Sequence, residues 1–325
     1  MRDYRHAIGV PRSIVILIWL VGMFGFAPIQ ADNAPGKKQT QEDGLPLLPP
    51  RALSEQPPSA PAPSARSMAS APAPRPSHVG PLDQQTHHPK PSPYSGPLVS
   101  IIMDDLGYRL REGLRAIDLP GPMTFSIIPN TPYAHRLSEL AHGLGKEILL
   151  HMPMEPQGKG HYLEPGGLTT RMTRAELTGS VHASIAAMPH ARGVSNHMGS
   201  LLTRQEKPMR WLMEAIREHD TDLYFIDSRT TAGTVASATA IQYGIPSLQR
   251  DVFLDHRQNV DAIRAQFHRL IRKAKTRGTA LGIAHPYPQT LDVLKTMLPR
   301  LEAQGLTLVF VSVLLAQQNR ENYSR

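Results

Sequence analysis

The chain has 325 residues, a formal charge of +8 and no cysteine. The missing cysteines exclude disulfides and thiolate metal sites, so any metal ion must be held by histidine and carboxylate side chains. The positive excess is modest, and its densest stretch, 264–277, has helical spacing with its charges on a solvated face, which does not favour nucleic-acid binding.

The first 31 residues have the pattern of an export signal. Three arginines, Arg2, Arg5 and Arg12, precede a short apolar stretch that ends near the small residues Ala27 and Ala31. This order predicts a secretory signal peptide, since the apolar stretch is short for a membrane span. An uncleaved anchor is the alternative. Both interpretations place the rest of the protein outside the cytoplasm, in the periplasm or cell envelope.

Residues 32–96 form a segment rich in proline, alanine and serine. The segment contains neither phenylalanine nor tryptophan, and runs such as 57–63 (PPSAPAP) favour extended, solvated conformations. We therefore predict a disordered linker that lets a folded domain stand away from the membrane. A partner-docking proline motif is the other interpretation, although such patterns arise by chance in proline-rich tracts.

From residue 97 to about 320, short apolar runs alternate with helical segments. The predicted strands are 98–103, 123–128, 147–150, 193–196, 223–226, 247–249, 280–284 and 307–311. The predicted helices are 133–144, 174–188, 207–219, 234–243, 260–276 and 291–304. Apolar strands that alternate with helices predict a parallel sheet covered by helices. About seven such units favour a (β/α) barrel over a sheet with two open edges.

Ionisable side chains follow five of the predicted strands. They are Asp104 with Asp105, His151, His197, Asp227 and His285. A lone aspartate after a strand is usually a cap, and a lone histidine is as often structural as functional. Because the C-terminal ends of parallel strands converge on one face of a barrel, we expect these residues to meet in one site.

The adjacent carboxylates Asp104 and Asp105 need compensation if both are buried, because like charges repel and desolvation is costly. A divalent cation held by one aspartate and two histidines would provide it. The other aspartate could then take a proton from an attacking water, and a histidine opposite could protonate the leaving group. This arrangement predicts hydrolysis of an amide or ester.

At these residues the chain resembles the polysaccharide deacetylase superfamily, and more closely its divergent branch from bacterial envelopes. The resemblance covers nearly the whole domain in order, and it is carried by the segments 102–108 (IMDDLGY), 123–125 (MTF), 149–154 (LLHMPM), 193–200 (GVSNHMGS), 225–228 (FIDS), 250–255 (RDVFLD) and 282–286 (GIAHP).

The resemblance implies a distorted (β/α) barrel that removes acetyl groups from N-acetylated sugars with zinc or a similar ion. It further implies that Asp104 is the general base, Asp105 a metal ligand and His285 the general acid. Ordinary members carry two metal-binding histidines together after the third strand, whereas His151 has no such partner. We therefore assign His197, from the next strand end, as the second histidine ligand.

Four further residues are assigned to supporting roles. Asp227 and Asp251 are each expected to orient His285 or bind a substrate hydroxyl, with a turn role equally open for Asp251. Asn196 is expected to donate to a substrate oxygen, and Arg250 to pair with Asp104 or another acidic residue. Asp255 is expected to cap a helix or form a turn.

These features predict a metal-dependent deacetylase of an N-acetylated envelope carbohydrate, with zinc as the expected cofactor. The expected partners are envelope polysaccharide or peptidoglycan, together with cell-wall enzymes as a further possibility. Membrane contact is expected only through an uncleaved N-terminal segment. The alternative is a non-catalytic envelope protein that uses the same fold to bind glycan or a cell-wall enzyme.

Overall fold

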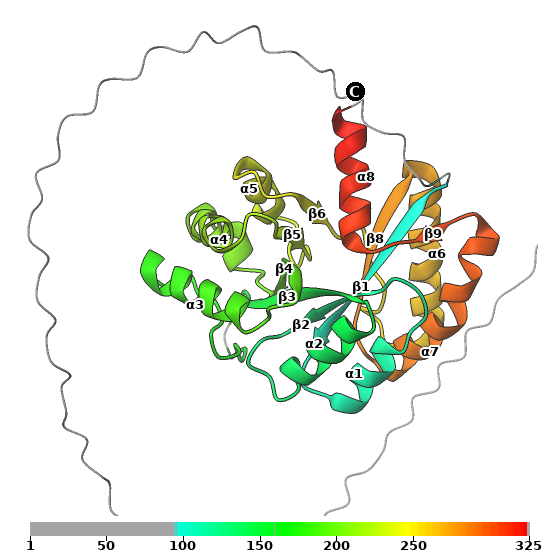
Figure 1. Ribbon diagram of the computed structural model, residues 1–325, viewed down its shortest axis with the longest axis horizontal. Helices are drawn as coiled ribbons and strands as arrows, with labels where there is room; N and C mark the ends of the chain where they lie inside the picture. The colour runs from blue at the N-terminus through cyan, green and yellow to red at the C-terminus, as the bar shows by residue number, and fades with distance from the viewer. Residues whose placement is uncertain (1–93, 95, 159, 324–325) are drawn as a thin grey trace, which may run out of the picture. The chain divides into compact units, whose positions relative to one another are not determined.

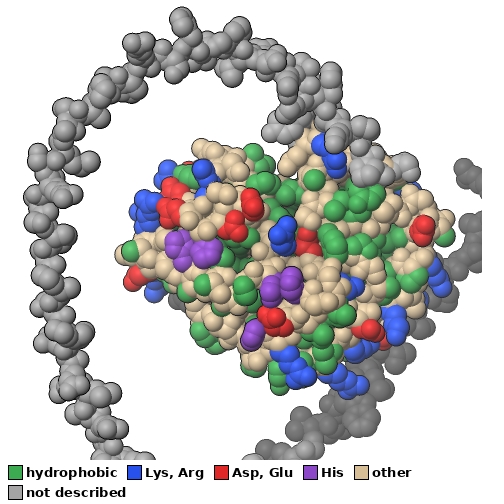
Figure 2. Space-filling model, viewed as in Figure 1, with side chains coloured by type: hydrophobic (Ala, Val, Ile, Leu, Met, Phe, Trp, Pro, Cys, Tyr) green, Lys and Arg blue, Asp and Glu red, His purple; other side chains and the backbone are tan. Residues whose placement is uncertain are grey.

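The computed structural model describes residues 94, 96–158 and 160–323 (Figure 1). The predicted export signal, 1–31, and nearly all of the predicted linker, 32–96, lie outside the described residues. Within the described part of the chain, no helix combines the length and the apolar composition that a membrane crossing requires. Basic and acidic side chains are interspersed over the face shown in Figure 2.

The domain is built on one parallel sheet of nine strands, which confirms the predicted fold class. The strands are β1 (Leu98–Leu106), β2 (Thr124–Ile127), β3 (Glu147–Met154), β4 (Ala191–Met198), β5 (Tyr224–Asp227), β6 (Ser247–Gln249), β7 (Val252–Phe253), β8 (Thr279–Ala284) and β9 (Thr307–Leu308). Their order is β6-β5-β4-β3-β2-β1-β8-β7, with β9 added beside the start of β1.

The connection between β6 and β7 curls the sheet into a distorted barrel. These strands lie at opposite ends of the strand order, yet only Arg250 and Asp251 separate them in the chain. The first part of this extended segment pairs with β5 and the last part pairs with β8. The two sheet edges are therefore held together by one continuous stretch of backbone.

Eight helices of the described chain surround the sheet. They are α1 (Leu110–Ile117), α2 (Ala134–Gly143), α3 (Arg174–Ala186), α4 (Glu206–His219), α5 (Ala236–Gln242), α6 (Val260–Arg277), α7 (Pro288–Met297) and α8 (Val311–Tyr323). Figure 1 shows α3, α4 and α5 beside β3 to β5, and α6 and α7 beside β1 and β8. Helix α3 begins with the capping box that its sequence indicates, in which Thr173 and Glu176 bond to each other's backbone N–H.

Alternate residues of β1 face two separate apolar layers. Val99, Ile101 and Met103 pack in the layer between the sheet and the outer helices. Leu98 and Ile102 pack in the inner layer, together with residues from β3, β5 and β8 and with Leu314 of α8. Because the side-chain period of a strand is two, Asp104 continues the inner row at the C-terminal end of β1.

Helix α8 starts where the sequence pattern predicts the last strand to continue. The predicted strand 307–311 ends at Leu308, and helix α8 begins at Val311. The buried Glu147, at the start of β3, accepts hydrogen bonds from the hydroxyl of Thr124 at 2.9 Å and from the backbone N–H of Ser312 at 3.3 Å. A carboxylate at a helix N-terminus stabilises that helix. The short elements α1 and β7 were also not predicted.

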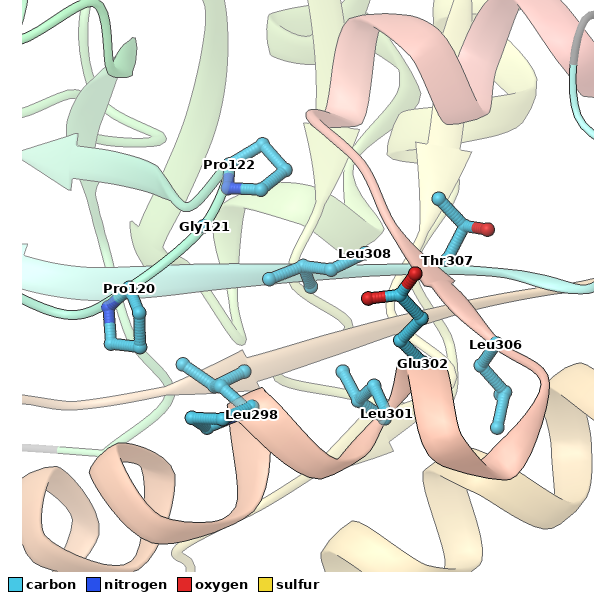
Figure 3. Close-up of a pocket in the computed structure, with 10 residues that line it drawn as sticks. Pro120, Gly121, Pro122, Leu298, Leu301, Glu302, Leu306, Thr307 and Leu308 are labelled. Atoms are coloured by element: carbon cyan, nitrogen blue, oxygen red, sulfur yellow. The ribbon is translucent and has the colours of Figure 1, made fainter.

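A cavity of about 380 Å³ lies at the N-terminal end of the sheet (Figure 3). Its walls are mainly proline and leucine side chains from the segment before β2 and from residues 298–308. Glu302 is the one charged residue among its described lining residues. The predicted catalytic residues Asp104 and His285 lie near the C-terminal ends of β1 and β8, so they are at the other end of the sheet.

Candidate metal and active site

The strand ends enclose a second cavity, of about 370 Å³. Its lining includes the predicted residues Asp104, Asp105, His151, Asn196, His197, Arg250 and His285. They lie in the C-terminal halves of β1, β3 and β4 or directly after β6 and β8, which is where chemistry sits in parallel β/α architectures. Of the predicted site residues, Asp227 and Asp251 are absent from this lining.

Asp105 reaches the cavity through an unusual backbone conformation. A regular strand sends adjacent side chains to opposite faces, so Asp104 and Asp105 would diverge. Asp105 has a φ of +60°, in the left-handed region that residues other than glycine rarely adopt. This conformation breaks the alternation, and both carboxylates line the cavity.

Two histidines approach the same oxygen of Asp105. His197 Nδ1 lies 2.7 Å from Asp105 Oδ1, and His151 Nε2 lies 3.1 Å from it. Burial favours the neutral acid, but the hydrogen bonds from both histidines outweigh it and hold the pKa of Asp105 well below its usual range. Asp105 is therefore ionised at neutral pH.

The ring of His151 is held by a chain of hydroxyl groups. Its Nδ1 lies 2.8 Å from Ser195 Oγ, which in turn lies 2.5 Å from Ser126 Oγ, and all three side chains are buried. This contact fixes the ring and directs Nε2 toward Asp105. Orientation of a metal-binding histidine through its other nitrogen is common in metal sites.

Glu164 lies beside the ring nitrogen of His197 that faces away from Asp105, as Ser195 does for His151. It lies in the loop between β3 and α3, is buried, and has its Oε1 at 3.6 Å from His197 Nε2 and 3.3 Å from the hydroxyl of Tyr108. Its other carboxylate oxygen has no hydrogen-bond partner among the described residues. Glu164 was not predicted, because it belongs to a loop and no strand pattern points to it.

Asp105, His151 and His197 fit a divalent cation. One potential ligand atom from each residue can be chosen so that all three lie within 4.8 Å of one another. Two imidazole nitrogens and a carboxylate oxygen form a donor set suited to zinc, and three protein ligands leave a position open for water or substrate. The predicted ligands therefore lie together, with supporting groups behind both histidines.

Asp104 lies next to this triad and is almost fully buried, with 2% of its surface exposed. Its Oδ2 lies 3.6 Å from His151 Nε2, whereas its Oδ1 has no hydrogen-bond partner among the described residues. Burial raises the pKa of Asp104. A carboxylate with a raised pKa and an unsatisfied oxygen is suited to accept a proton.

His285 is oriented by Asp255, whereas Asp227 or Asp251 was expected in this role. Asp255 Oδ1 lies 3.0 Å from His285 Nδ1, and Oδ2 accepts the backbone N–H of His285 at 2.6 Å. Asp251 precedes β7, pairs with Arg277 and accepts the backbone N–H of Leu281. Asp251 lies four positions before Asp255, and no described contact joins its carboxylate to His285.

Asp227 also faces away from the cavity. Ile226 belongs to the inner layer, so the next residue of β5 points outward. The carboxylate of Asp227 accepts hydrogen bonds from the hydroxyl of Thr234 at 2.9 Å and from the backbone N–H of Arg229 at 2.8 Å. It holds the loop after β5 and does not contact His285.

Asn196 and Arg250 line the cavity but make contacts other than those expected. The Asn196 amide donates to Met198 O at 2.9 Å and accepts from the backbone N–H of Ser228 at 2.8 Å. Arg250 forms no ion pair with Asp104; its Nε donates to Ser228 O at 2.6 Å and its Nη2 to Arg229 O at 2.8 Å. Both residues therefore brace the loop after β5.

Strained backbone is concentrated around this cavity. Four described residues other than glycine have a positive φ, and three of them, Asp105, Met198 and Arg229, line the cavity. Conformations of this kind cost energy and persist where the surroundings impose them, commonly at functional sites.

The family model for divergent polysaccharide deacetylases matches residues 101–315. The chain is 35% identical over 224 residues to the uncharacterized protein YibQ of Escherichia coli (strain K12), with 69% of each chain covered. It is 36% identical over 203 residues to an uncharacterized protein of Haemophilus influenzae, covering 62% of this chain and 71% of that one.

A solved structure has a similar fold. An uncharacterized protein from Agrobacterium tumefaciens C58 superimposes with a TM-score of 0.65 at 26% identity, covering 69% of this chain and 92% of the other. The fold, the order of the strand-end residues and the match over residues 101–315 agree. The chain belongs to the divergent polysaccharide deacetylase family.

Proposed function

We propose that this protein is a metal-dependent hydrolase that removes acetyl groups from an N-acetylated carbohydrate of the cell envelope. The observation that supports it most is the convergence of Asp105, His151 and His197 into one candidate metal site, beside the buried Asp104 and with His285 Nε2 at 3.6 Å from Asp105 Oδ2. Membership of the deacetylase family supports the choice of reaction.

Asp105, His151 and His197 would hold the cation, and zinc suits their donor atoms. When bound, the cation supplies Lewis acidity toward the acyl oxygen and lowers the pKa of water. Ser195 behind His151 and Glu164 behind His197 keep the ring nitrogens directed at the site. The cation would also compensate the charges of the adjacent aspartates.

Asp104 would act as the general base. Its raised pKa brings its proton affinity closer to that needed at neutral pH, and its free Oδ1 is available to accept a proton from the attacking water. The ion-paired Asp105 has a pKa shifted the other way and is the poorer proton acceptor. The pKa values of these two neighbouring carboxylates are shifted in opposite directions, which suits Asp105 to be a ligand and Asp104 to be a base.

His285 would act as the general acid toward the leaving amine. Although burial lowers the pKa of His285, the hydrogen bond that its ring donates to Asp255 and the charges of Asp105, Asp255 and Asp104 raise it to about 9. The ring is therefore protonated at neutral pH. Its ring also packs against the rings of Phe253 and Tyr287, with centroid distances of 5.1 and 5.6 Å.

An export signal in residues 1–31 and a linker in residues 32–96 would place this domain in the periplasm or envelope, where acetylated glycans and peptidoglycan are found. We therefore propose such a polymer as substrate. Acetylated glycan fragments are suitable probes, because they present the acetamido group without the full polymer.

Acetate release tests the proposed function. The zinc-loaded protein is incubated with N-acetylglucosamine oligosaccharides and with peptidoglycan fragments, and acetate is measured enzymatically. Acetate release should fall at least 100-fold in Asp104→Asn and in His285→Ala, in line with the loss of general acid–base groups, and should be unchanged in the control His268→Ala, an exposed helix residue. Zinc binding without acetate release from either substrate class would contradict the hydrolase and favour a glycan-binding protein.

A further inference from the structure

The loop after β5 carries an arginine that the proposed reaction does not use. Arg229 is exposed, lines the cavity with the metal ligands, and forms no ion pair with any described acidic residue. Its own backbone is fixed at both ends, since its N–H donates to Asp227 and its carbonyl accepts from Arg250. The side chain of Arg229 therefore extends from a fixed backbone beside the site, and no described acidic residue pairs with its charge.

Arg250 lies next to Arg229, and one side of its guanidinium group makes no hydrogen bond to a described residue. Its Nε and Nη2 groups are occupied by the carbonyls of Ser228 and Arg229, and its guanidinium carbon lies 4.9 Å from the centre of the Phe253 ring. Its Nη1 group makes no hydrogen bond to a described residue. Burial and the neighbouring charge of Arg229 lower the pKa of Arg250, so the two cations are close enough to repel each other.

Ser228 adds an unpaired hydroxyl at the same place. The side chain is 7% exposed, lines the cavity, and its Oγ has no hydrogen-bond partner among the described residues. A buried polar group without a partner is uncommon and suggests that something else satisfies it. Hydrogen-bond donors from three residues therefore gather on the β5–β6 side of the cavity.

The position of this group relative to the metal ligands is fixed by hydrogen bonds. The hydroxyl of Thr230 donates to Met198 O at 2.8 Å, and Met198 directly follows the predicted ligand His197. Asn196 holds the N–H of Ser228. The cavity thus has carboxylates and imidazoles on the β1, β3, β4 and β8 side, and cationic donors on the side of β5 and β6.

We infer that Ser228, Arg229 and Arg250 form a subsite for an anionic substituent of the substrate, so that the protein acts on acidic acetylated sugars in preference to neutral ones. This inference rests on the proposed function, because it assumes that the acetamido group occupies the metal side of the cavity. Guanidinium groups match the planar geometry of carboxylates and also bind phosphates. A carboxylate or a phosphate on the sugar supplies the required chemistry.

Binding measurements with three matched ligands test this subsite. Isothermal titration calorimetry with the full zinc-loaded chain measures the affinity for three ligands. They are an N-acetylglucosamine oligosaccharide, an oligosaccharide of the same length that contains N-acetylmuramic acid, and N-acetylglucosamine phosphate. The second ligand carries a carboxylate and the third a phosphate, so the comparison separates the two sources of charge. At least one acidic ligand should bind roughly tenfold more tightly than the neutral one, as expected for a charged hydrogen bond.

Arg229→Gln should abolish most of this preference, and Arg229→Lys, which keeps the charge, should retain part of it. The control Arg210→Gln removes an equal charge from the exposed side of α4 and should leave the preference intact. Raising the salt concentration should weaken the preference in the parent protein. Equal binding of acidic and neutral ligands, or an unchanged preference in Arg229→Gln, would overturn the subsite.

Acetate release measured on the same three ligands separates the two proposals. Release from neutral and acidic sugars at equal rates, unaffected by Arg229→Gln, would overturn the subsite and leave the hydrolase standing. Arg229-dependent binding of an acidic ligand without acetate release would support the subsite and contradict the hydrolase.

Discussion

Asp255 holds His285 through two contacts at once: one carboxylate oxygen accepts the backbone N–H at 2.6 Å, and the other lies 3.0 Å from ring Nδ1. Thr290 donates to the same carboxylate at 2.9 Å, so Asp255 is itself fixed. The ring of His285 is thereby oriented with Nε2 toward the cavity, and its charged form is favoured.

Asp255→Asn should lower the pKa of His285 in the metal-free protein. The parent value is about 9, and the variant should move toward the ordinary value near 6.5, because the asparagine supplies no charge. Titration of the His285 ring by nuclear magnetic resonance measures the shift. An unchanged pKa in the variant would show that Asp255 is not a major cause.

The Asp255→Asn substitution should also cause a pH-dependent loss of folding stability. A histidine with a raised pKa in the folded state contributes stability that is fully present below its unfolded pKa and is lost as the pH rises through about 9. Asp255→Asn should therefore cost on the order of 1–2 kcal/mol more at pH 6 than at pH 10. Urea unfolding of the metal-free proteins at both pH values checks this, and a pH-independent difference would argue against it.

Ser195→Ala should weaken zinc binding while leaving the fold intact. The substitution removes the group that orients His151 through Nδ1, and loss of such a partner costs roughly 10–100-fold in metal affinity. Competition titration against a chromophoric chelator gives the affinity. Ser126→Ala, one step further along the same chain of hydroxyls, should have a smaller effect.

Glu164→Gln should weaken zinc binding by about tenfold, since it removes the negative charge behind His197 but preserves the shape of the side chain. Tyr108→Phe is the matched control, because it removes the other partner of the same Glu164 oxygen and leaves the charge. Equal affinity in the parent and in Glu164→Gln would show that the carboxylate does not support His197.

Glu147→Ala should destabilise the domain without affecting zinc affinity. The buried carboxylate joins Thr124 to the N-terminus of α8 at the end of the sheet away from the metal ligands. Its removal leaves buried donors unpaired, with an expected cost of about 2–4 kcal/mol in unfolding free energy. Chemical denaturation and zinc titration of the same samples distinguish the two effects.

Much of the barrel could be predicted, because its strands are apolar runs bounded by turn residues and its helices are amphipathic. The ionisable residues in the C-terminal halves of β1, β3 and β4, and His285 directly after β8, line one cavity, as the convergence of parallel strand ends requires. The start of α8 was wrongly predicted as strand. The carboxylate at its N-terminus comes from Glu147, 165 residues before Ser312, so the local sequence does not indicate it.

The residues that support the metal ligands and His285 were harder to predict, because their roles depend on contacts between distant parts of the chain. Asp251 and Asp255 differ by four positions on one extended segment, and only the register of β7 against β8 shows which one meets His285. Asp227 lies at the end of a strand, but the alternation of side chains along β5 directs it away from the cavity. Glu164 lies in a loop, where spacing carries no information on contacts.

The proposed reaction depends on a divalent metal ion held by Asp105, His151 and His197. Elemental analysis of the full chain, purified without chelator and compared with His197→Ala and the control His268→Ala, tests it most directly. About one equivalent of metal, zinc by preference, is expected in the parent and the control, and a large loss in His197→Ala. A parent protein without metal after zinc loading, or full occupancy in His197→Ala, would contradict it.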